Sequence, residues 1–522
     1  MHSPRRGVLR WAILSRWLLI LISAISNFII PDHNATDVFI QPAEDEDEFL
    51  NGLHFFDNLV KALLGGLVRW DAQYFLLITK HGYIFENSLA FFPLFPLLTR
   101  WLSYFLSYFL YNILTESSIV LLSATIINFA AFLKAADVLY SLSVFVLHDA
   151  NLAYIAALLF CFNPASVFFS APYTESLFCL LSFSGMYETL TSNWDVSSSI
   201  LFGLSSGTRS NGVLNVGFIL FKRVKLFVTV LWPGTICPKL ESNPLVSLRA
   251  VLMWMFSVIV LCMVILIPFL SFQIFSYLMY CTPQDIELTP KLMNYAVDHG
   301  LILPSLGGKK IRVKTHWCHS TLPLPYSYVQ SHYWNVGFLK YFSISQIPNF
   351  LLALPIAYLI LRYGIEFFNQ HKSMCLRLGL TRKTASKAEG TFRMPANTFV
   401  FVVHSVVLTI FCFLCIHVQV TTRMLLSASP VPYWVGAYLI YEGFVSARKA
   451  KDKGIRAGGV TSYNVPVAVC TEWKYVNSLE DFIEYFTFMK TQLTCHGKLL
   501  ILYFASYFVI GTILFSNFLP WT

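Results

Sequence analysis

Long apolar stretches alternate with shorter polar stretches along almost the whole chain. The first runs from Trp11 to Ile30, which is long enough to cross a bilayer as a helix. Ten more lie at residues 90–113, 118–147, 151–170, 174–190, 197–221, 247–280, 342–366, 396–418, 424–446 and 498–519. The pattern predicts an all-α polytopic membrane protein over residues 1–522, a single integral-membrane domain with roughly 8–11 transmembrane helices. A β-barrel is excluded, because its strands are short and alternate in polarity.

Two regions depart from simple spans. Asn163-Pro164 and Ala171-Pro172 interrupt the middle apolar segments, so half-helices or re-entrant turns are expected there. Irregular backbone at membrane depth persists only where protein or a wet cavity surrounds it. Residues 54–86 mix apolar and polar positions, which favours short helices along the membrane surface.

Charged residues predict the orientation. Basic residues precede the first span, so residues 11–30 are interpreted as a transmembrane anchor whose positive end stays cytosolic. Residues 31–89 then form a lumenal loop, where Asn34 begins a glycosylation acceptor motif. The same rule places the basic clusters at 222–225, 371–393 and 448–458 in the cytosol. It places the large 281–341 loop and the 417–423 turn in the lumen.

Composition supports this picture. The chain is 56% hydrophobic and only 12% charged, against about 25% charged residues in soluble domains. The net charge of +9 comes from basic residues in short stretches between apolar segments, as topology signals do, so no nucleic-acid partner is expected.

Asp71 is the residue that points most directly to chemistry. A carboxylate fixed at a membrane surface among aromatic residues is what a lipid-linked sugar transferase requires, because an acceptor hydroxyl needs a base. On the residues alone, Asp71 is equally suited to cap a helix or to pair with Arg69.

Polar motifs that follow one another along the chain carry a family resemblance. They are Arg69-Trp70-Asp71-Ala72, His81-Gly82-Tyr83, Phe91-Phe92-Pro93, Phe162-Asn163-Pro164-Ala165, Tyr173-Thr174-Glu175, Arg209-Ser210-Asn211-Gly212, Tyr333-Trp334-Asn335-Val336-Gly337-Phe338, Gln346-Ile347-Pro348-Asn349-Phe350, His417-Val418-Gln419-Val420-Thr421-Thr422-Arg423 and Asn517-Phe518-Leu519-Pro520-Trp521-Thr522. Together they resemble the PIG-V family of GPI mannosyltransferases, in the GT-C superfamily.

The resemblance implies a fold and a reaction. The fold is a GT-C-type bundle whose lumenal loops carry the active site. The reaction transfers the second mannose of the GPI anchor, in α-1,6 linkage, from dolichyl phosphate mannose to the GPI precursor glycolipid. It takes place in the lumen of the endoplasmic reticulum (ER) and inverts the anomeric carbon, with Asp71 as the general base.

Arginines are the expected partners of the leaving phosphate. Arg209 lies within an apolar segment, where an arginine marks a functional or paired site, and its alternative role is an ion pair with Glu175 or Asp137. Arg423 suits phosphate equally, or else anchors a helix end. Glu175 is expected to bind the acceptor or to pair with Arg209.

The other motif residues are assigned to substrate binding. Trp334 and Asn335 suggest a sugar platform, and His81 is expected to orient Asp71 or to bind sugar. The full set is Arg69, Trp70, His81, Glu175, Arg209, Asn211, Trp334, Asn335, His417 and Arg423.

No cofactor is predicted, although a divalent metal is left open. Asp45 and Asp47 have metal-ligand spacing, but they lie in an acidic run typical of a solvated tether. Cys281 and Cys318 share one predicted lumenal loop, so a disulfide between them is open. An accessory membrane subunit is a further candidate partner, recruited by the acidic or basic insertions.

Three other functions fit parts of the pattern. A dolichol-phosphate-sugar transferase with a different acceptor would share all of these features. A transporter would share the composition, but it would be expected to show inverted repeats. A structural subunit of a transferase complex would not need Asp71.

Overall fold

The structure, a computed structural model, describes residues 4–33, 54–231, 244–283, 288–304, 316–380, 394–442 and 493–521. Within these ranges the chain is helical and contains no strand. The prediction of an all-α protein is therefore confirmed. Asn34, the acidic run at 44–48, the basic residues at 448–458 and most of the 371–393 stretch lie outside the described residues.

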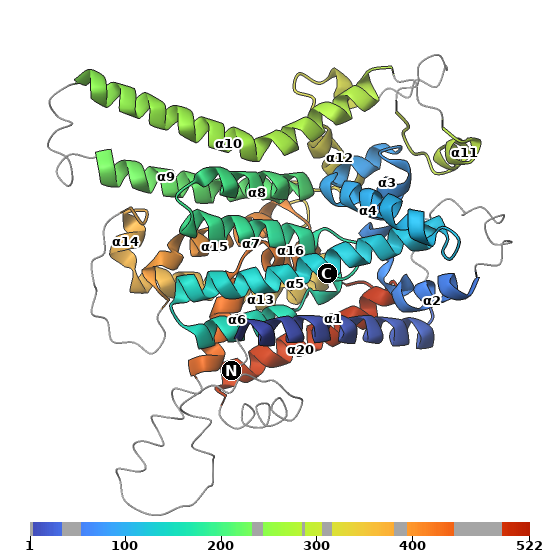
Figure 1. The fold of residues 1–522 in the computed structure, drawn as a ribbon, viewed down its shortest axis with the longest axis horizontal. Helices are drawn as coiled ribbons and strands as arrows, with labels where there is room; N and C mark the ends of the chain where they lie inside the picture. The colour runs from blue at the N-terminus through green and yellow to red at the C-terminus, as the bar shows by residue number, and fades with distance from the viewer. Residues whose placement is uncertain are drawn as a thin grey trace, which may run out of the picture.

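Six helices of the described part are long and apolar enough to cross a membrane. They are α1 (Pro4–Ile29), α5 (Glu116–Leu147), α10 (Pro244–Cys281), α13 (Ile347–Gln370), α15 (Phe399–Cys415) and α20 (Cys495–Ser516). The protein is thus a multi-pass membrane protein, and these helices lie side by side in one bundle (Figure 1).

The other predicted spans consist of shorter helices. These are α4 (Leu94–Leu110), α6 (Ala150–Cys161), α7 (Glu175–Thr191), α8 (Asp195–Thr208), α9 (Val216–Leu231), α16 (Thr421–Ala428) and a helix over 431–442. Breaks in the backbone divide these apolar segments, and within the described residues six helices meet the length and apolarity of a span.

One division corrects the sequence-based interpretation. Arg209 does not lie inside a helical span, because α8 ends before it and the 3-10 helix η5 (Ser210–Asn215) follows. The basic pair Lys222 and Arg223 lies within α9 rather than in a loop. Both side chains reach Asp195, with N–O distances of 2.7 and 2.6 Å, and Asp195 is only 3% exposed. The two pairs compensate a carboxylate that would be costly to bury alone.

The predicted break at the two prolines is confirmed. α6 ends at Cys161 and α7 begins at Glu175, with only the short η4 (Ser166–Phe169) between them. Every residue from Asn163 to Thr174 is buried. Backbone carbonyls of this segment that no helix pairs must therefore be satisfied from within the protein.

Two buried side chains satisfy them. Arg16 of α1 donates to the carbonyl oxygens of Cys161 and Ser166, both at 3.0 Å. Asn128 of α5 donates to the carbonyl oxygens of Ala171 and Tyr173. The break is consequently held from both ends.

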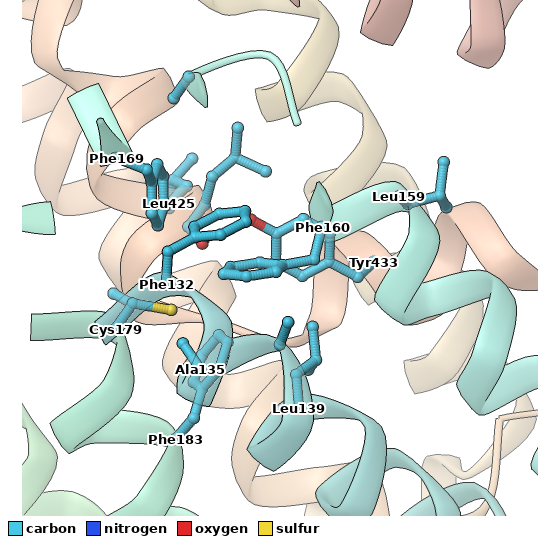
Figure 2. Close-up of a cluster of buried hydrophobic side chains, with 14 of the residues drawn as sticks. Phe132, Ala135, Leu139, Leu159, Phe160, Phe169, Cys179, Phe183, Leu425 and Tyr433 are labelled. Atoms are coloured by element: carbon cyan, nitrogen blue, oxygen red, sulfur yellow. The ribbon is translucent and has the colours of Figure 1, made fainter. Parts of the chain in front are cut away.

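Aromatic packing surrounds this break. The rings of Phe132 and Phe160 stack with their centroids 4.7 Å apart, and Phe169 meets both edge-on (Figure 2). Arg16 lies over the Phe132 ring at 3.8 Å, so the same side chain links the core to the broken backbone.

Short helices from both predicted lumenal loops gather at one end of the bundle (Figure 1). They are α2 (His54–Leu64), α3 (Asp71–His81), η3 (Glu86–Ala90), α11 (Pro290–Asp298) and α12 (Pro325–Tyr333). The basic α14 (Lys372–Leu376) lies at the opposite end. Short helices in the 54–86 region are thus confirmed, whereas the side of the membrane that each end faces stays a prediction.

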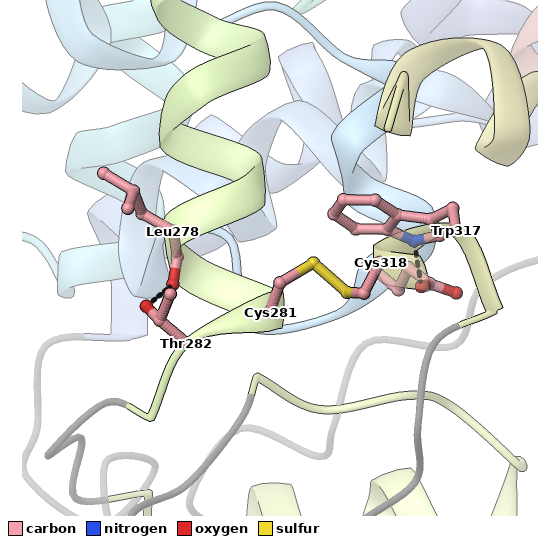
Figure 3. The surroundings of a disulfide bond; sticks show 6 residues. Leu278, Cys281, Thr282, Trp317 and Cys318 are labelled. Atoms are coloured by element: carbon pink, nitrogen blue, oxygen red, sulfur yellow. Dashed lines mark hydrogen bonds between the residues drawn. A yellow bond between two sulfur atoms is a disulfide. The ribbon is translucent and has the colours of Figure 1, made fainter. Parts of the chain in front are cut away.

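A disulfide closes the large loop. Cys281, the last residue of α10, is bonded to Cys318, with their Cα atoms 5.6 Å apart (Figure 3). The pairing left open by the sequence is therefore present, and it ties residues 316–319 to the end of α10.

Candidate active site

A cavity of about 700 Å³ opens where the short helices meet the bundle. Six of the predicted site residues line it: Asp71, Arg209, Asn211, Trp334, His417 and Arg423. They come from segments far apart in the sequence, so the fold brings the three predicted lumenal stretches together in one place.

Asp71 is held by its backbone. It is the first residue of α3 and follows Trp70, whose φ of 54° lies in the left-handed region that a bulky residue rarely adopts. The Tyr173 hydroxyl accepts a hydrogen bond from the Asp71 amide at 3.1 Å and donates to the Arg69 carbonyl at 3.2 Å. Tyr173 therefore stabilises the strained turn that places Asp71 at the cavity.

The Asp71 carboxylate pairs with Arg423. Arg423 Nη2 lies 2.9 Å from Asp71 Oδ2, and the two side chains are 14% and 30% exposed, respectively. The Arg423 guanidinium also lies over the rings of Phe168 and Tyr173, at 5.0 and 5.4 Å. Charge and stacking together fix the arginine, while part of the carboxylate stays open to the cavity.

Glu175 connects both arginines. Its side chain is 0% exposed, and its Oε1 accepts a hydrogen bond from Arg209 Nη1 and lies 3.8 Å from Arg423 Nη1. Its Oε2 is buried and has no hydrogen-bond partner among the described residues. We call Asp71, Glu175, Arg209 and Arg423 the ion cluster. Its two positive and two negative side chains balance in formal charge.

The alternative pairing of Arg209 with Asp137 does not occur. Asp137 pairs with Arg5 and Lys134 instead. Arg209 Nη1 also donates to Thr174 Oγ1 at 3.1 Å, so two adjacent residues that follow the proline break hold the same guanidinium nitrogen.

The turn after Arg209 depends on a glycine. A Cβ atom at Gly212 would come within 2.5 Å of the Ser205 backbone in α8. Glycine is therefore needed for η5 to fold back against α8 and direct Arg209 and Asn211 to the cavity.

Aromatic residues form another side of the cavity. We call Phe91, Phe92, Tyr326 and Trp334 the aromatic wall. Trp334 meets Phe91 edge-on with centroids 5.9 Å apart, and Phe92 meets Tyr326 in the same way at 5.4 Å. Aromatic faces of this kind suit the apolar faces of sugar rings. The Tyr326 hydroxyl is also 2.7 Å from Ser210 Oγ, which joins the wall to η5.

Arg69 and Trp70 do not line the cavity. Arg69 instead contacts Asn27 Oδ1 at 2.6 Å, Asp32 Oδ2 at 3.0 Å and the Ser516 carbonyl at 3.0 Å. These contacts tie the start of α3 to α1 and α20. Asn335 is exposed beside the wall, with a φ of 50° that asparagine tolerates well.

His81 lies at the other end of α3 from Asp71. Ten residues at 1.5 Å per residue separate the two by roughly 15 Å, so His81 does not contact Asp71. Desolvation and the neighbouring Lys80 lower the pKa of His81, which favours its neutral form.

His417 lines the cavity beside another aromatic residue. Its ring centroid lies 4.6 Å from that of Tyr341, and burial lowers its pKa. No group of three or more His, Cys, Asp or Glu side chains converges as a metal site within the described residues.

Two residues of the site were not assigned from the sequence. Tyr173 acts through the backbone of residues 69–71, and Glu86 lies behind the aromatic wall. The only sequence signal was the closeness of each to a motif, since Tyr173 begins Tyr173-Thr174-Glu175 and Glu86 precedes Phe91-Phe92-Pro93.

Comparison with known proteins identifies the family. The family model described as mannosyltransferase (PIG-V) matches residues 5–522. The chain belongs to the PIG-V mannosyltransferase family. As a PIG-V mannosyltransferase, it is an enzyme. Asp71, Arg209 and Arg423 of the ion cluster line a cavity of the size that substrates require.

Relatives aligned over nearly their full length support the same family assignment. GPI alpha-1,6-mannosyltransferase 2 of Cricetulus griseus is 36% identical over 535 residues, covering 100% of this chain and 99% of the relative. The protein of the same name from Homo sapiens is 36% identical, with 99% of each covered. GPI mannosyltransferase 2 of Drosophila melanogaster is 30% identical, again with 99% of each covered.

One solved structure is similar at a lower level. The oligosaccharyltransferase of Archaeoglobus fulgidus shares 12% identity at a TM-score of 0.43, covering 97% of this chain and 56% of that one. Because both values are low, we draw no conclusion from this similarity.

Proposed function

We propose that this PIG-V mannosyltransferase adds the second mannose, in α-1,6 linkage, to the GPI-anchor precursor glycolipid. The donor is dolichyl phosphate mannose, and the reaction occurs at the lumenal side of the ER membrane. The observation that carries the proposal is the ion cluster, which combines a partly exposed carboxylate with two arginines in one cavity. The names of the full-length relatives support the acceptor and the linkage.

Asp71 is the general base. As the acceptor hydroxyl attacks the anomeric carbon, the O–H bond breaks and its proton passes to the Asp71 carboxylate. The new C–O bond forms opposite the leaving group, so the anomeric carbon inverts. Arg423 at 2.9 Å holds one oxygen of the carboxylate, which leaves the other available to the acceptor.

The arginines stabilise the leaving group. When the C–O bond to phosphate breaks, its electron pair leaves with dolichyl phosphate, whose negative charge rises. Protonation of Asp71 in the same step removes one carboxylate partner of Arg423, so the balanced cluster gains positive charge as the phosphate gains negative charge. Preorganised charge of this kind stabilises a transition state without reorganisation.

The roles of the remaining residues follow from their places. Glu175 fixes Arg209 and Arg423 rather than binding the acceptor, because its side chain is fully buried and paired. Asn211, Trp334 and His417 contact the sugars from the cavity lining. Arg69, Trp70, His81 and Asn335 are not assigned substrate contacts.

The test is product analysis in membranes that lack the native activity. The full chain is supplied together with labelled dolichyl phosphate mannose and a one-mannose GPI precursor, and the glycolipids are separated. The proposal expects a two-mannose product that an α-1,6-specific mannosidase cleaves. If the well-expressed chain mannosylates a different acceptor, or if another linkage forms, the proposal is wrong.

A further inference from the structure

Glu86 is a buried carboxylate outside the ion cluster. Its side chain is 0% exposed, and within the described residues no cation pairs with it. Two neutral donors satisfy it instead. Trp317 Nε1 donates to Oε1 at 2.7 Å, and the Tyr333 hydroxyl donates to Oε2 at 2.8 Å.

The two donors belong to the large loop, whereas Glu86 belongs to the first loop. Trp317 is adjacent to Cys318, which is bonded to the end of α10, and the Trp317 hydrogen bond is drawn beside the disulfide in Figure 3. Tyr333 is the last residue of α12 and is adjacent to Trp334. Glu86 begins η3, which leads directly into Phe91 and Phe92. The carboxylate thus joins the two chain segments that supply the aromatic wall.

A buried carboxylate is costly unless hydrogen bonds satisfy it. Each oxygen of Glu86 has one donor, so any displacement of Trp317 or Tyr333 would leave a buried acceptor unsatisfied. The cost of that loss makes the arrangement rigid, in a way that an apolar contact of equal size would not.

We propose that Glu86 is a positioning residue that fixes Trp334 and Phe91 and thereby sets the shape of the acceptor sugar site. This inference rests on the proposed function, since it takes a saccharide as the occupant of the wall. Glu86 itself does not line the cavity, so it acts through its neighbours.

The test compares Glu86→Met with wild type in two measurements. Methionine keeps the length of the side chain but removes both acceptor oxygens, so neither Trp317 Nε1 nor the Tyr333 hydroxyl keeps its acceptor. Hydrogen exchange of the full chain in lipid nanodiscs should show faster exchange in α12. The KM for the one-mannose acceptor should rise at least roughly tenfold, as expected when buried donors are left without an acceptor, while kcat changes less than about twofold.

A second variant removes one of the two donors. Tyr333→Phe, introduced into Glu86→Met, should cause no further rise in KM, because the Tyr333 hydroxyl has already lost its acceptor in Glu86→Met. Asp57→Leu is the matched control. Asp57 is also buried, and it accepts hydrogen bonds from Thr115 away from the cavity. It should leave the exchange of α12 and the acceptor KM unchanged.

Unchanged exchange in α12 would overturn the inference whether or not activity is detected. An unchanged KM, with only the amount of folded protein reduced, would also overturn it, because the role would then be structural alone. If wild type makes no two-mannose product, the proposed function fails, and the exchange of α12 still decides whether Glu86 holds the wall.

Discussion

The two sides of the cavity are held by different forces. The ion cluster joins α3, α7, α16 and the turn after α8 through charged pairs among largely buried side chains. The aromatic wall is held by hydrogen bonds from Trp317 and Tyr333 to Glu86, by ring contacts, and by a disulfide that ties the loop carrying Trp317 to α10. The charged pairs position the carboxylate and the arginines that respond to charge developing in the reaction, whereas the aromatic wall determines the shape of the sugar site. Disruption of the first should therefore impair the chemical step, and disruption of the second should impair substrate binding.

Replacement of Arg423 should have the largest effect. In Arg423→Met, Asp71 loses its paired arginine, and Glu175 keeps Arg209 as its paired arginine. The leaving phosphate also loses a positive contact. We expect kcat to fall by about 10²–10³-fold, as for the loss of one electrostatic stabiliser. Steady-state kinetics at equal protein abundance measures this. Arg423→Lys should recover only part of the activity, because lysine keeps the charge but lacks the planar guanidinium group.

Arg100→Met is the control for this prediction, because Arg100 makes a surface contact with Tyr104 and lies outside the cavity lining. Its activity should match wild type. An Arg423→Met enzyme with normal kcat would show that the ion cluster takes no part in the chemical step.

Removal of the disulfide should have an intermediate effect. Cys281→Ser with Cys318→Ser releases Trp317 and its neighbours from α10, so the aromatic wall loses one of its attachments. We expect the acceptor KM to rise about threefold to tenfold, with kcat nearly unchanged, and stability to fall by about 2–4 kcal/mol. Thermal unfolding and kinetics of the same preparation separate the two effects.

The matching control is Cys495→Ser, because Cys495 is an exposed free thiol. This variant should change neither the acceptor KM nor the stability. A fall in kcat without a change in KM for the double serine variant would contradict the division of roles between the two sides.

Replacement of His81 should have the smallest effect. His81 lies at the far end of α3, so His81→Gln should change activity less than about twofold between pH 6 and 8. Because the folded state lowers its pKa, the stabilising contribution of neutral His81 is present above the unfolded pKa of about 6.5 and is lost as pH falls through the folded pKa.

The variant should therefore lose part of the acid sensitivity of wild-type stability. Thermal unfolding at pH 5 and pH 7 measures this difference. A large loss of activity in His81→Gln at neutral pH would mean that α3 contributes to catalysis along its whole length.

Much of the fold was predictable, because apolar runs and prolines in the sequence directly mark where helices lie and where they break. Span-length runs identified helices such as α1 and α10, and prolines identified the break before α7. Hydropathy did not reveal the break at Arg209, since it depends on the close approach of Gly212 to α8. It also misplaced Lys222 in a loop, because the buried partner of Lys222 lies 27 positions earlier in the chain, at Asp195.

The candidate site was predictable only in part. Residue chemistry and family motifs identified the members of the ion cluster. They could not reveal that Glu175 bridges both arginines, because that depends on how α7 and α16 pack. Tyr173 and Glu86 act on partners 102 and 231 positions away, so no local pattern marks them.

The most direct test of the account replaces Asp71 with asparagine, which keeps the size of the side chain and removes its basicity. Asp32→Asn is the control, because Asp32 is a more exposed carboxylate that pairs with Arg69 near the same turn. Both variants are assayed for the two-mannose product at equal abundance. The account predicts that Asp71→Asn loses at least about 10²-fold in kcat, while Asp32→Asn stays close to wild type. An Asp71→Asn enzyme with the wild-type rate would contradict the assignment of the base.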